Sequence, residues 1–265
     1  MDEVVQKFLR STGPVLCVDI GSGTQDALLA RPGLECENWP RFVLPAPARL
    51  VAQRIRELTL LKRNIWLYGG NMGGGFIQAL KEHLAAGLAV SATPAATRGI
   101  HDNEDVVRGI GVEICAVCPE GSVPVFLTDY SPEFWGGLLR HAGLPLPHLV
   151  LAAAQDHGFH AHGNRQARMR AWTELLATSS DPARWIYETP PPALTRLVPL
   201  REKTGGPVAD TGASALLGAL CDKEVMDRSF RQGITIINVG NGHTVAALVY
   251  RGQVRGACEA QAQEQ

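Results

Sequence analysis

VLCVDIGSGTQDALL, residues 15–29, is the stretch on which the fold of this chain depends. An apolar run ends at an acid, passes through two glycines and continues as a second apolar run. Continuous apolar runs of this length are typical of buried strands. Glycine adopts positive φ freely, so Gly21-Ser22-Gly23 predicts a tight turn. The stretch therefore predicts a buried β-hairpin that carries polar residues at its tip: Asp19, Gly21, Gly23, Thr24 and Asp26.

A second stretch repeats this pattern much later in the chain. Residues 234–250 place N-V-G-N-G-H-T between two apolar runs, where the first stretch has D-I-G-S-G-T. The main-chain N–H groups of a glycine-rich turn can converge on an anion such as phosphate. A carboxylate at the strand end can hold a hydrated Mg²⁺ beside it. Two facing hairpins would clamp a phosphate chain, and the alternative is that the glycines of both hairpins only make turns.

The remaining pattern predicts an α/β protein, because strands alternate with helices. Apolar residues over Ala48–Leu61 recur at helical spacing and predict an amphipathic helix that faces the core. Ser131-Pro132-Glu133 combines a cap residue, a first-turn proline and a first-turn acid, which predicts a helix that runs to about His141.

Composition narrows the class of partner. The net charge of −1 provides no basic field, so we expect neither nucleic-acid binding nor binding to an anionic membrane. The amino-terminal residues lack the apolar run of a secretory signal, and no stretch has the length of a membrane span. Six scattered cysteines in such a chain predict reduced thiols and a cytoplasmic protein. Cys115 and Cys118 are expected to be half-buried thiols, and the alternatives are a redox pair or half of a metal site.

The two hairpins resemble the first and second phosphate motifs of the superfamily of acetate and sugar kinases, heat-shock chaperones and actin. DIGSGTQD is similar to the first motif and INVGNGHTVAALVYRGQV to the second. The resemblance implies the ribonuclease H-like, actin/sugar-kinase type of α/β fold, with two domains around a nucleotide cleft. We expect the first domain, with insertions, over residues 1–205 and the start of the second over residues 206–265.

A closer resemblance covers most of the chain. NMGGGFIQALKEHLAAG, ATPAAT, AAAQDHG, GNRQARMR, DTGASALLGAL and NVGNGHT together resemble the prokaryotic family called domain of unknown function 1786. Its members often carry the label "pyruvate formate-lyase activating enzyme-like". A radical-SAM activase needs three cysteines close together for its iron–sulfur cluster. Only Cys115 and Cys118 are close here, so we reject that activity.

Two departures from the kinase-like pattern affect the prediction. Asn238 occupies the position where the second motif usually carries Asp, which predicts weaker metal binding. The chain stops at Gln265, and GACEAQAQEQ is expected to be a polar tail, so the second domain is expected to be incomplete.

Other polar clusters offer alternative sites. QDHGFHAHGNR follows a predicted strand, and the carboxyl ends of strands are where α/β sheets bind ligands. Asp156, His157, Asn164 and Arg165 are candidates for substrate binding. Asp156 with His157, His160 and His162 could instead hold a metal ion. The Gly-rich loop in YGGNMGGGF is either a packing turn or a ligand-facing loop, and HDNED at 101–105 is expected to cap a short helix.

The leading hypothesis is binding of ATP or another nucleotide with Mg²⁺, with phosphotransferase or ATPase activity. Asp19 would hold Mg²⁺, and Asp26 or Gln25 would orient a water molecule. Two sets of residues would hold the phosphate ligand: Gly21, Ser22, Gly23 and Thr24 on one side, and Asn238, Gly240, Asn241, Gly242, His243 and Thr244 on the other. The alternatives are a non-catalytic nucleotide- or metabolite-sensing scaffold and a metal-dependent hydrolase centred on Asp156. The sequence predicts neither the substrate nor the oligomeric state.

Overall fold

The structure, a computed structural model, describes residues 13–156, 158, 164–240 and 243–261. Its first sheet has six strands in the order β3-β2-β1-β8-β10-β9. Strands β1 (Val15–Ile20), β2 (Thr24–Ala30) and β3 (Arg41–Pro45) form an antiparallel meander. Strand β8 (Leu149–Ala154) and strand β10 (Val208–Ala209) continue it in parallel, and β9 (Ile186–Tyr187) closes the far edge.

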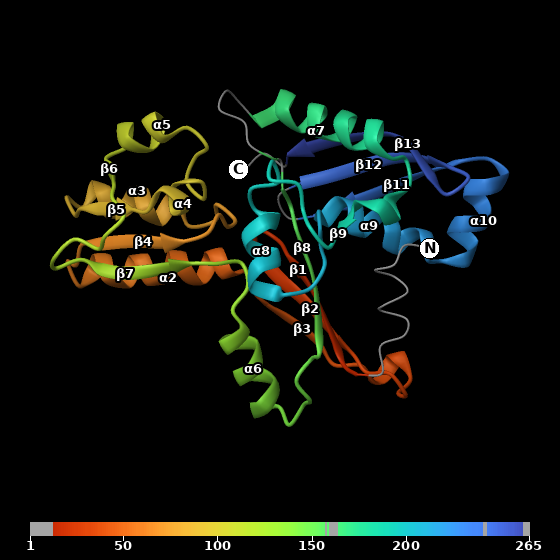
Figure 1. The fold of residues 1–265 in the computed structure, drawn as a ribbon, viewed down its shortest axis with the longest axis horizontal. Helices are drawn as coiled ribbons and strands as arrows, with labels where there is room; N and C mark the ends of the chain where they lie inside the picture. Colours follow the sequence, from red (N-terminus) through yellow and green to blue (C-terminus); the bar gives the residue numbers. More distant parts are fainter. Residues whose placement is uncertain (1–12, 157, 159–163, 241–242, 262–265) are drawn as a thin grey trace.

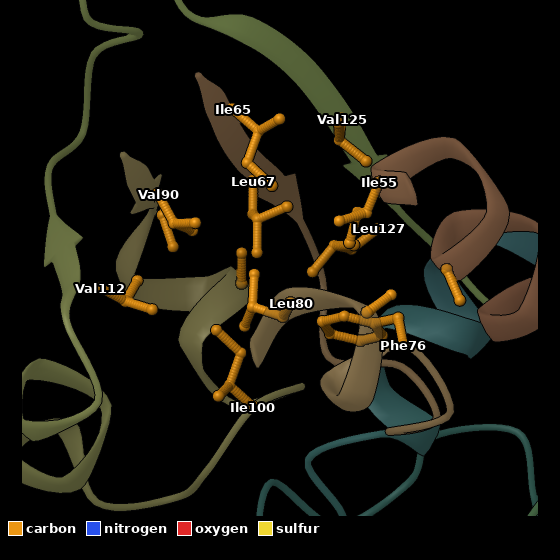
Figure 2. Packing of buried hydrophobic residues seen from close by; sticks show 14 of the residues in the cluster. Ile55, Ile65, Leu67, Phe76, Leu80, Val90, Ile100, Val112, Val125 and Leu127 are labelled. Carbon is orange, nitrogen blue, oxygen red and sulfur yellow. The ribbon is translucent and has the colours of Figure 1, made fainter. Parts of the chain in front are cut away.

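A second sheet, inserted between β3 and β8, is wholly parallel. Its order is β6-β5-β4-β7, with β4 (Ile65–Gly69), β5 (Val90–Ala92), β6 (Val112–Ile114) and β7 (Val123–Leu127). Helices α2 (Pro47–Leu60) and α3 (Ile77–Ala85) pack on one face. Figure 2 shows Ile65, Leu67, Val125 and Leu127 of this face meeting Ile55 and Leu80 of the helices. Short helices α4 (Pro94–Thr97) and α5 (Glu104–Gly109) connect β5 to β6.

A third sheet is a meander of β11 (Ile234–Val239), β12 (His243–Tyr250) and β13 (Gln253–Gln261). One face shares an apolar core with α7 (Asn164–Thr178), α9 (Thr211–Leu220) and α10 (Lys223–Arg231). In Figure 1 this unit lies on one side of the six-stranded sheet and the parallel insertion on the other. The prediction of a polar tail over residues 256–265 is wrong for residues 256–261, because they belong to β13.

The mixed α/β class is confirmed, and a meander continued by parallel strands is the arrangement of a ribonuclease H-like sheet. The division of the chain at residue 205 stays a prediction. Strand β10, just beyond that point, still pairs with β8 of the first sheet. The meander at residues 234–261 is what the structure describes of the second unit's sheet.

Both helices predicted from local signals are present. Helix α2 covers the expected amphipathic segment, with Ala48, Ala52, Ile55 and Leu58 on its buried face. Helix α6 (Pro132–His141) begins after Ser131, whose hydroxyl accepts the N–H of Phe134 at 3.1 Å. Helix α8 (Leu197–Thr204) lies between β9 and β10 in the chain. Within the described ranges, no helix combines the length and the apolar character that crossing a membrane requires.

Candidate functional site

A cleft of about 590 Å³ lies where the three sheets meet, and both glycine hairpins border it. The end of β8, the start of α8 and the start of α9 form further walls. Two loops of the inserted unit, residues 71–75 and 98–102, also line the cleft, as do Ala48 of α2 and Ile77 of α3. The two hairpins lie more than 200 residues apart in the sequence and line one cavity. This is the arrangement that the phosphate-clamp hypothesis required.

The first hairpin turns where the sequence predicted. Gly21 donates its N–H to the carbonyl of Thr24 at 2.9 Å, which closes the turn. The carbonyl of Gly23 accepts the N–H of Ala46 at 3.1 Å, so the end of β3 supports the turn from behind. Gly21, Ser22 and Thr24 line the cleft. The loop is therefore held in place while its tip faces the cavity.

Two carboxylates stand side by side on this hairpin. Asp19 of β1 and Asp26 of β2 are register partners, and both line the cleft. Asp19 accepts the hydroxyl of Thr211 at 2.7 Å, and Asp26 accepts that of Thr24 at 3.0 Å. Burial raises the pKa of Asp19, the hydrogen bond from Thr211 lowers it, and the charge of Asp26 raises it again. A paired site of this kind suits a hydrated divalent cation, because Mg²⁺ takes one or two carboxylates and keeps several waters.

Gln25 does not face the cleft. Its side chain is buried and donates to the carbonyl of Pro45 at 3.1 Å. Side chains alternate along a strand, so the residue between Thr24 and Asp26 points to the opposite face of β2. Of the two residues predicted to orient a water molecule, only Asp26 borders the cavity.

The second hairpin repeats the main-chain bond of the first. Gly240 donates its N–H to the carbonyl of His243 at 2.8 Å, at the position that corresponds to Gly21 and Thr24. Asn238, Gly240 and His243 line the cleft. Thr244 pairs with Val239 in the sheet and is not part of the lining. Asn241 and Gly242, also predicted to hold phosphate, lie outside the described residues.

Asp156 lies at the carboxyl end of β8 and lines the cleft, but its carboxylate has another function. It accepts the N–H groups of Arg196 and Leu197 at 2.8 and 2.9 Å, so it caps the start of α8. Its other oxygen accepts the N–H of Gly158 at 2.8 Å. Burial raises the pKa of Asp156, and the three main-chain hydrogen bonds lower it. These bonds explain the acid at this position without a substrate or metal ligand.

The other members of the predicted histidine cluster lie outside the described residues, namely His157, His160 and His162. Asn164 and Arg165 begin α7, and their side chains lie outside the described part as well. Among the residues that the structure does describe, no group of three or more His, Cys, Asp or Glu side chains could hold a metal ion. The metal-dependent hydrolase stays a prediction.

Arg196 and Asp129 form a buried ion pair that the sequence did not indicate. The Arg196 Nε lies 2.6 Å from one oxygen of Asp129, and Nη2 lies 2.9 Å from the other. Nη1 donates to the carbonyl of Gln155 at 3.0 Å. Burial lowers the pKa of Arg196, but the Asp129, Asp156 and Asp210 carboxylates together keep that pKa above its ordinary value. The guanidinium borders the cleft and offsets the carboxylates around it.

Two more acids, both half-buried as whole residues, join the second unit to the first sheet. Asp210 accepts the N–H groups of Gly212 at 2.8 Å and Asp156 at 2.9 Å, and burial raises its pKa to about 7. Glu259 of β13 has a side chain only 4% exposed. Its carboxylate accepts the side chains of Gln155, Trp172 at 3.1 Å and His243 at 3.0 Å. An N-cap signal in DTGAS could have indicated Asp210, whereas Glu259 was assigned to the expected tail.

The structure also describes the Gly-rich loop, the HDNED segment and the two neighbouring cysteines. Residues 71–75 line the cleft, so the Gly-rich loop faces the cavity. Asn103 caps α5 by accepting the N–H of Asp105 at 2.9 Å, as expected for HDNED, while His101 and Asp102 border the cleft. Cys115 and Cys118 are half-buried free thiols that donate to main-chain carbonyls.

The chain is similar to known proteins in its sequence and in its fold. A family model described as "Putative pyruvate format-lyase activating enzyme (DUF1786)" matches residues 72–264, so the chain belongs to this family. No protein with a curated description matches the sequence. One similar solved structure is the Aquifex aeolicus member of the Ppx/GppA protein family, at 8% identity and a TM-score of 0.29. The alignment covers 94% of this chain and 51% of the Aquifex chain, so this chain spans about half the length of that protein.

Proposed function

We propose that this member of the DUF1786 family binds a magnesium–nucleotide complex in the cleft and transfers or releases its terminal phosphoryl group there. One observation carries the proposal. Two turns with the same main-chain hydrogen bond, Gly21 to Thr24 and Gly240 to His243, line the same cavity. A phosphate chain between them would meet main-chain groups from both sides, which is the arrangement that glycine-rich turns offer to anions.

The carboxylates of the first hairpin would hold the cation. Asp19 and Asp26 stand on neighbouring strands with their side chains at the cavity wall. When bound, Mg²⁺ supplies charge neutralisation to the phosphate oxygens, and phosphoryl transfer depends mainly on such charge stabilisation and on positioning. Thr211 orients the Asp19 carboxylate through its hydrogen bond.

Titration calorimetry of the full chain with ATP, with and without Mg²⁺, tests the binding step, and a phosphate-release assay tests the reaction. Asp19→Asn is expected to lower the affinity for Mg²⁺-ATP at least tenfold, because it removes one of the two charges that would hold the cation. Asp227→Asn is the matched control, since Asp227 is exposed on α10, outside the cleft. Equal affinity of wild type and Asp19→Asn for Mg²⁺-ATP would refute the proposal.

A non-catalytic nucleotide-sensing protein is the second candidate, and Asn238 favours it. This amide lines the cleft where the resembled motif carries a carboxylate. With one acid fewer, the cleft has less means to stabilise a metal ion during transfer. Binding of Mg²⁺-ATP without phosphate release would support this candidate. Phosphate release gained in Asn238→Asp would identify the missing carboxylate as the reason.

A further inference from the structure

Arg98 is a cation of the cleft that has no ionic partner among the described residues. It follows α4, is exposed to solvent and lines the same cavity as the two hairpins. Arg196, by contrast, is bound by Asp129 and by the carbonyl of Gln155. Of the arginines that the described lining contains, Arg98 alone keeps its guanidinium available to a ligand.

The loop that carries Arg98 packs against the Gly-rich loop. A Cβ added to Gly99 would lie 3.5 Å from the ring of Phe76, and one added to Gly74 would lie 3.9 Å from the carbonyl oxygen of Gly99. The Gly-rich loop in turn reaches the first hairpin, because a Cβ on Gly75 would lie 3.6 Å from the carbonyl oxygen of Ser22. Arg98 therefore belongs to the part of the cleft that the inserted unit forms, next to the tip of the first hairpin.

The charges around the cavity make a fixed cation valuable there. Its described lining contains four carboxylates, Asp19, Asp26, Asp102 and Asp156. A nucleotide that arrives with Mg²⁺ carries its own counter-charge. A second anionic ligand brings none and would be repelled by these carboxylates unless a positive side chain bound it. Guanidinium is suited to this purpose, because its planar fork matches carboxylate and phosphate oxygens.

We propose that Arg98 anchors a second ligand of the cleft, a small molecule that bears a carboxylate or a phosphate group, beside the nucleotide. The proposal deepens the proposed function and rests on it in one respect, that the nucleotide occupies the space between the hairpins. The inserted parallel unit then has a function in this cleft, since it brings Arg98 to the cavity that the acidic hairpin also lines.

The experiment titrates the full chain with two probes, inorganic phosphate and succinate, in a calorimeter. Each titration is made with the protein alone and again with saturating Mg²⁺ and the non-hydrolysable β,γ-imido analogue of ATP. Wild type is expected to bind at least one probe in both conditions, and the probe that binds tells phosphate from carboxylate. Arg98→Gln is expected to weaken that binding at least tenfold and to leave the affinity for the nucleotide analogue unchanged.

Matched variants separate this proposal from the nucleotide site. Arg63→Gln removes an exposed arginine outside the cleft and should bind like wild type. Asp19→Asn should lose the nucleotide analogue and keep the anion. The proposal is overturned if wild type binds neither probe, if Arg98→Gln binds the probe like wild type, or if Arg98→Gln loses the nucleotide analogue instead. Wild type that binds the anion but no Mg²⁺-nucleotide refutes the proposed function and leaves an anion site at Arg98.

Discussion

Thr211 donates its hydroxyl to the Oδ1 of Asp19 at 2.7 Å, although the two residues are 192 positions apart. The bond joins the first turn of α9 to the end of β1. It favours the charged form of a carboxylate whose pKa burial has raised. Asp19 is thus kept available to a cation by a group from the other half of the chain.

Replacing Thr211 by valine tests this bond. The variant keeps the shape of the side chain and removes the donor, so the pKa of Asp19 should rise further and Mg²⁺-ATP should bind more weakly. Hydrogen bonds to charged groups contribute roughly 1.5–3 kcal/mol, which corresponds to a loss of about tenfold or more in affinity. Calorimetry measures it. Thr211→Ser, which retains the hydroxyl, should bind like wild type, and a serine variant as weak as the valine variant would contradict the assignment.

Asp210 should make the stability of the protein depend on pH. Its pKa is raised to about 7 in the folded chain by burial, and lies near 3.9 in an unfolded chain. Between these values the folded chain holds a proton that the unfolded chain has released. The free energy of unfolding should therefore fall as pH rises through this window, by up to about 1.4 kcal/mol per pH unit, and this contribution should level off above about pH 7.

Asp210→Asn removes this titration. Urea denaturation of both proteins at about pH 5 and about pH 8 measures the effect. The variant should be less stable than wild type at the lower pH by more than it is at the higher pH, because wild type alone loses stability between them. Parallel pH profiles of the two proteins would show that the Asp210 carboxylate does not titrate in this range.

Removing one partner of the Arg196–Asp129 pair should destabilise the protein more than removing both. Arg196→Met leaves the Asp129 carboxylate, only 2% exposed, without its cation. Breaking a buried pair in this way destabilises proteins by roughly 3–5 kcal/mol. The double variant with Asp129→Leu removes both charges and should recover most of that loss. Urea denaturation of wild type, both single variants and the double variant gives the four free energies of unfolding. A double variant no more stable than Arg196→Met would refute the pairing as the cause.

Gly206 should not tolerate a side chain. A Cβ at this position would lie 1.9 Å from the carbonyl oxygen of Val150, so Gly206→Ala must displace the main chain between α8 and β10. Overpacking of this kind costs about 1–3 kcal/mol. Thermal unfolding measures it. Gly218→Ala is the matched control, because it lies on α9 with nothing within 4 Å and should gain roughly 0.5–1 kcal/mol from helix propensity. Equal melting temperatures for wild type and Gly206→Ala would contradict the close approach.

The features that the sequence predicted correctly are local. Two glycine turns between apolar runs, and the Ser131 cap of α6, depend on neighbours within a few residues. Both hairpins line one cavity, and this agrees with what the resemblance to the kinase and actin superfamily implied, namely two such motifs around one cleft.

The features that it missed depend on residues far apart in the chain. Asp156 lines the cleft as its position after a strand predicted, but the sequence did not indicate that its carboxylate caps α8. Gln25 was expected at the site, yet its buried side chain donates to the carbonyl of Pro45. No motif in the neighbouring sequence marks Arg98 or Arg196 as a site residue, and only the folded chain brings these cations to the cleft. No pattern of spacing links Asp129 to Arg196, 67 residues later.

The three apolar cores have a consequence for how the molecule melts. Each sheet packs with its own helices, and the cavity lies between these packed bodies instead of inside any of them. Bodies of this kind can open separately, each with its own free energy. A ligand that contacts all three bodies would stabilise them together. The ligand-free protein would then unfold in several steps, and the ligand-bound protein in a single cooperative transition.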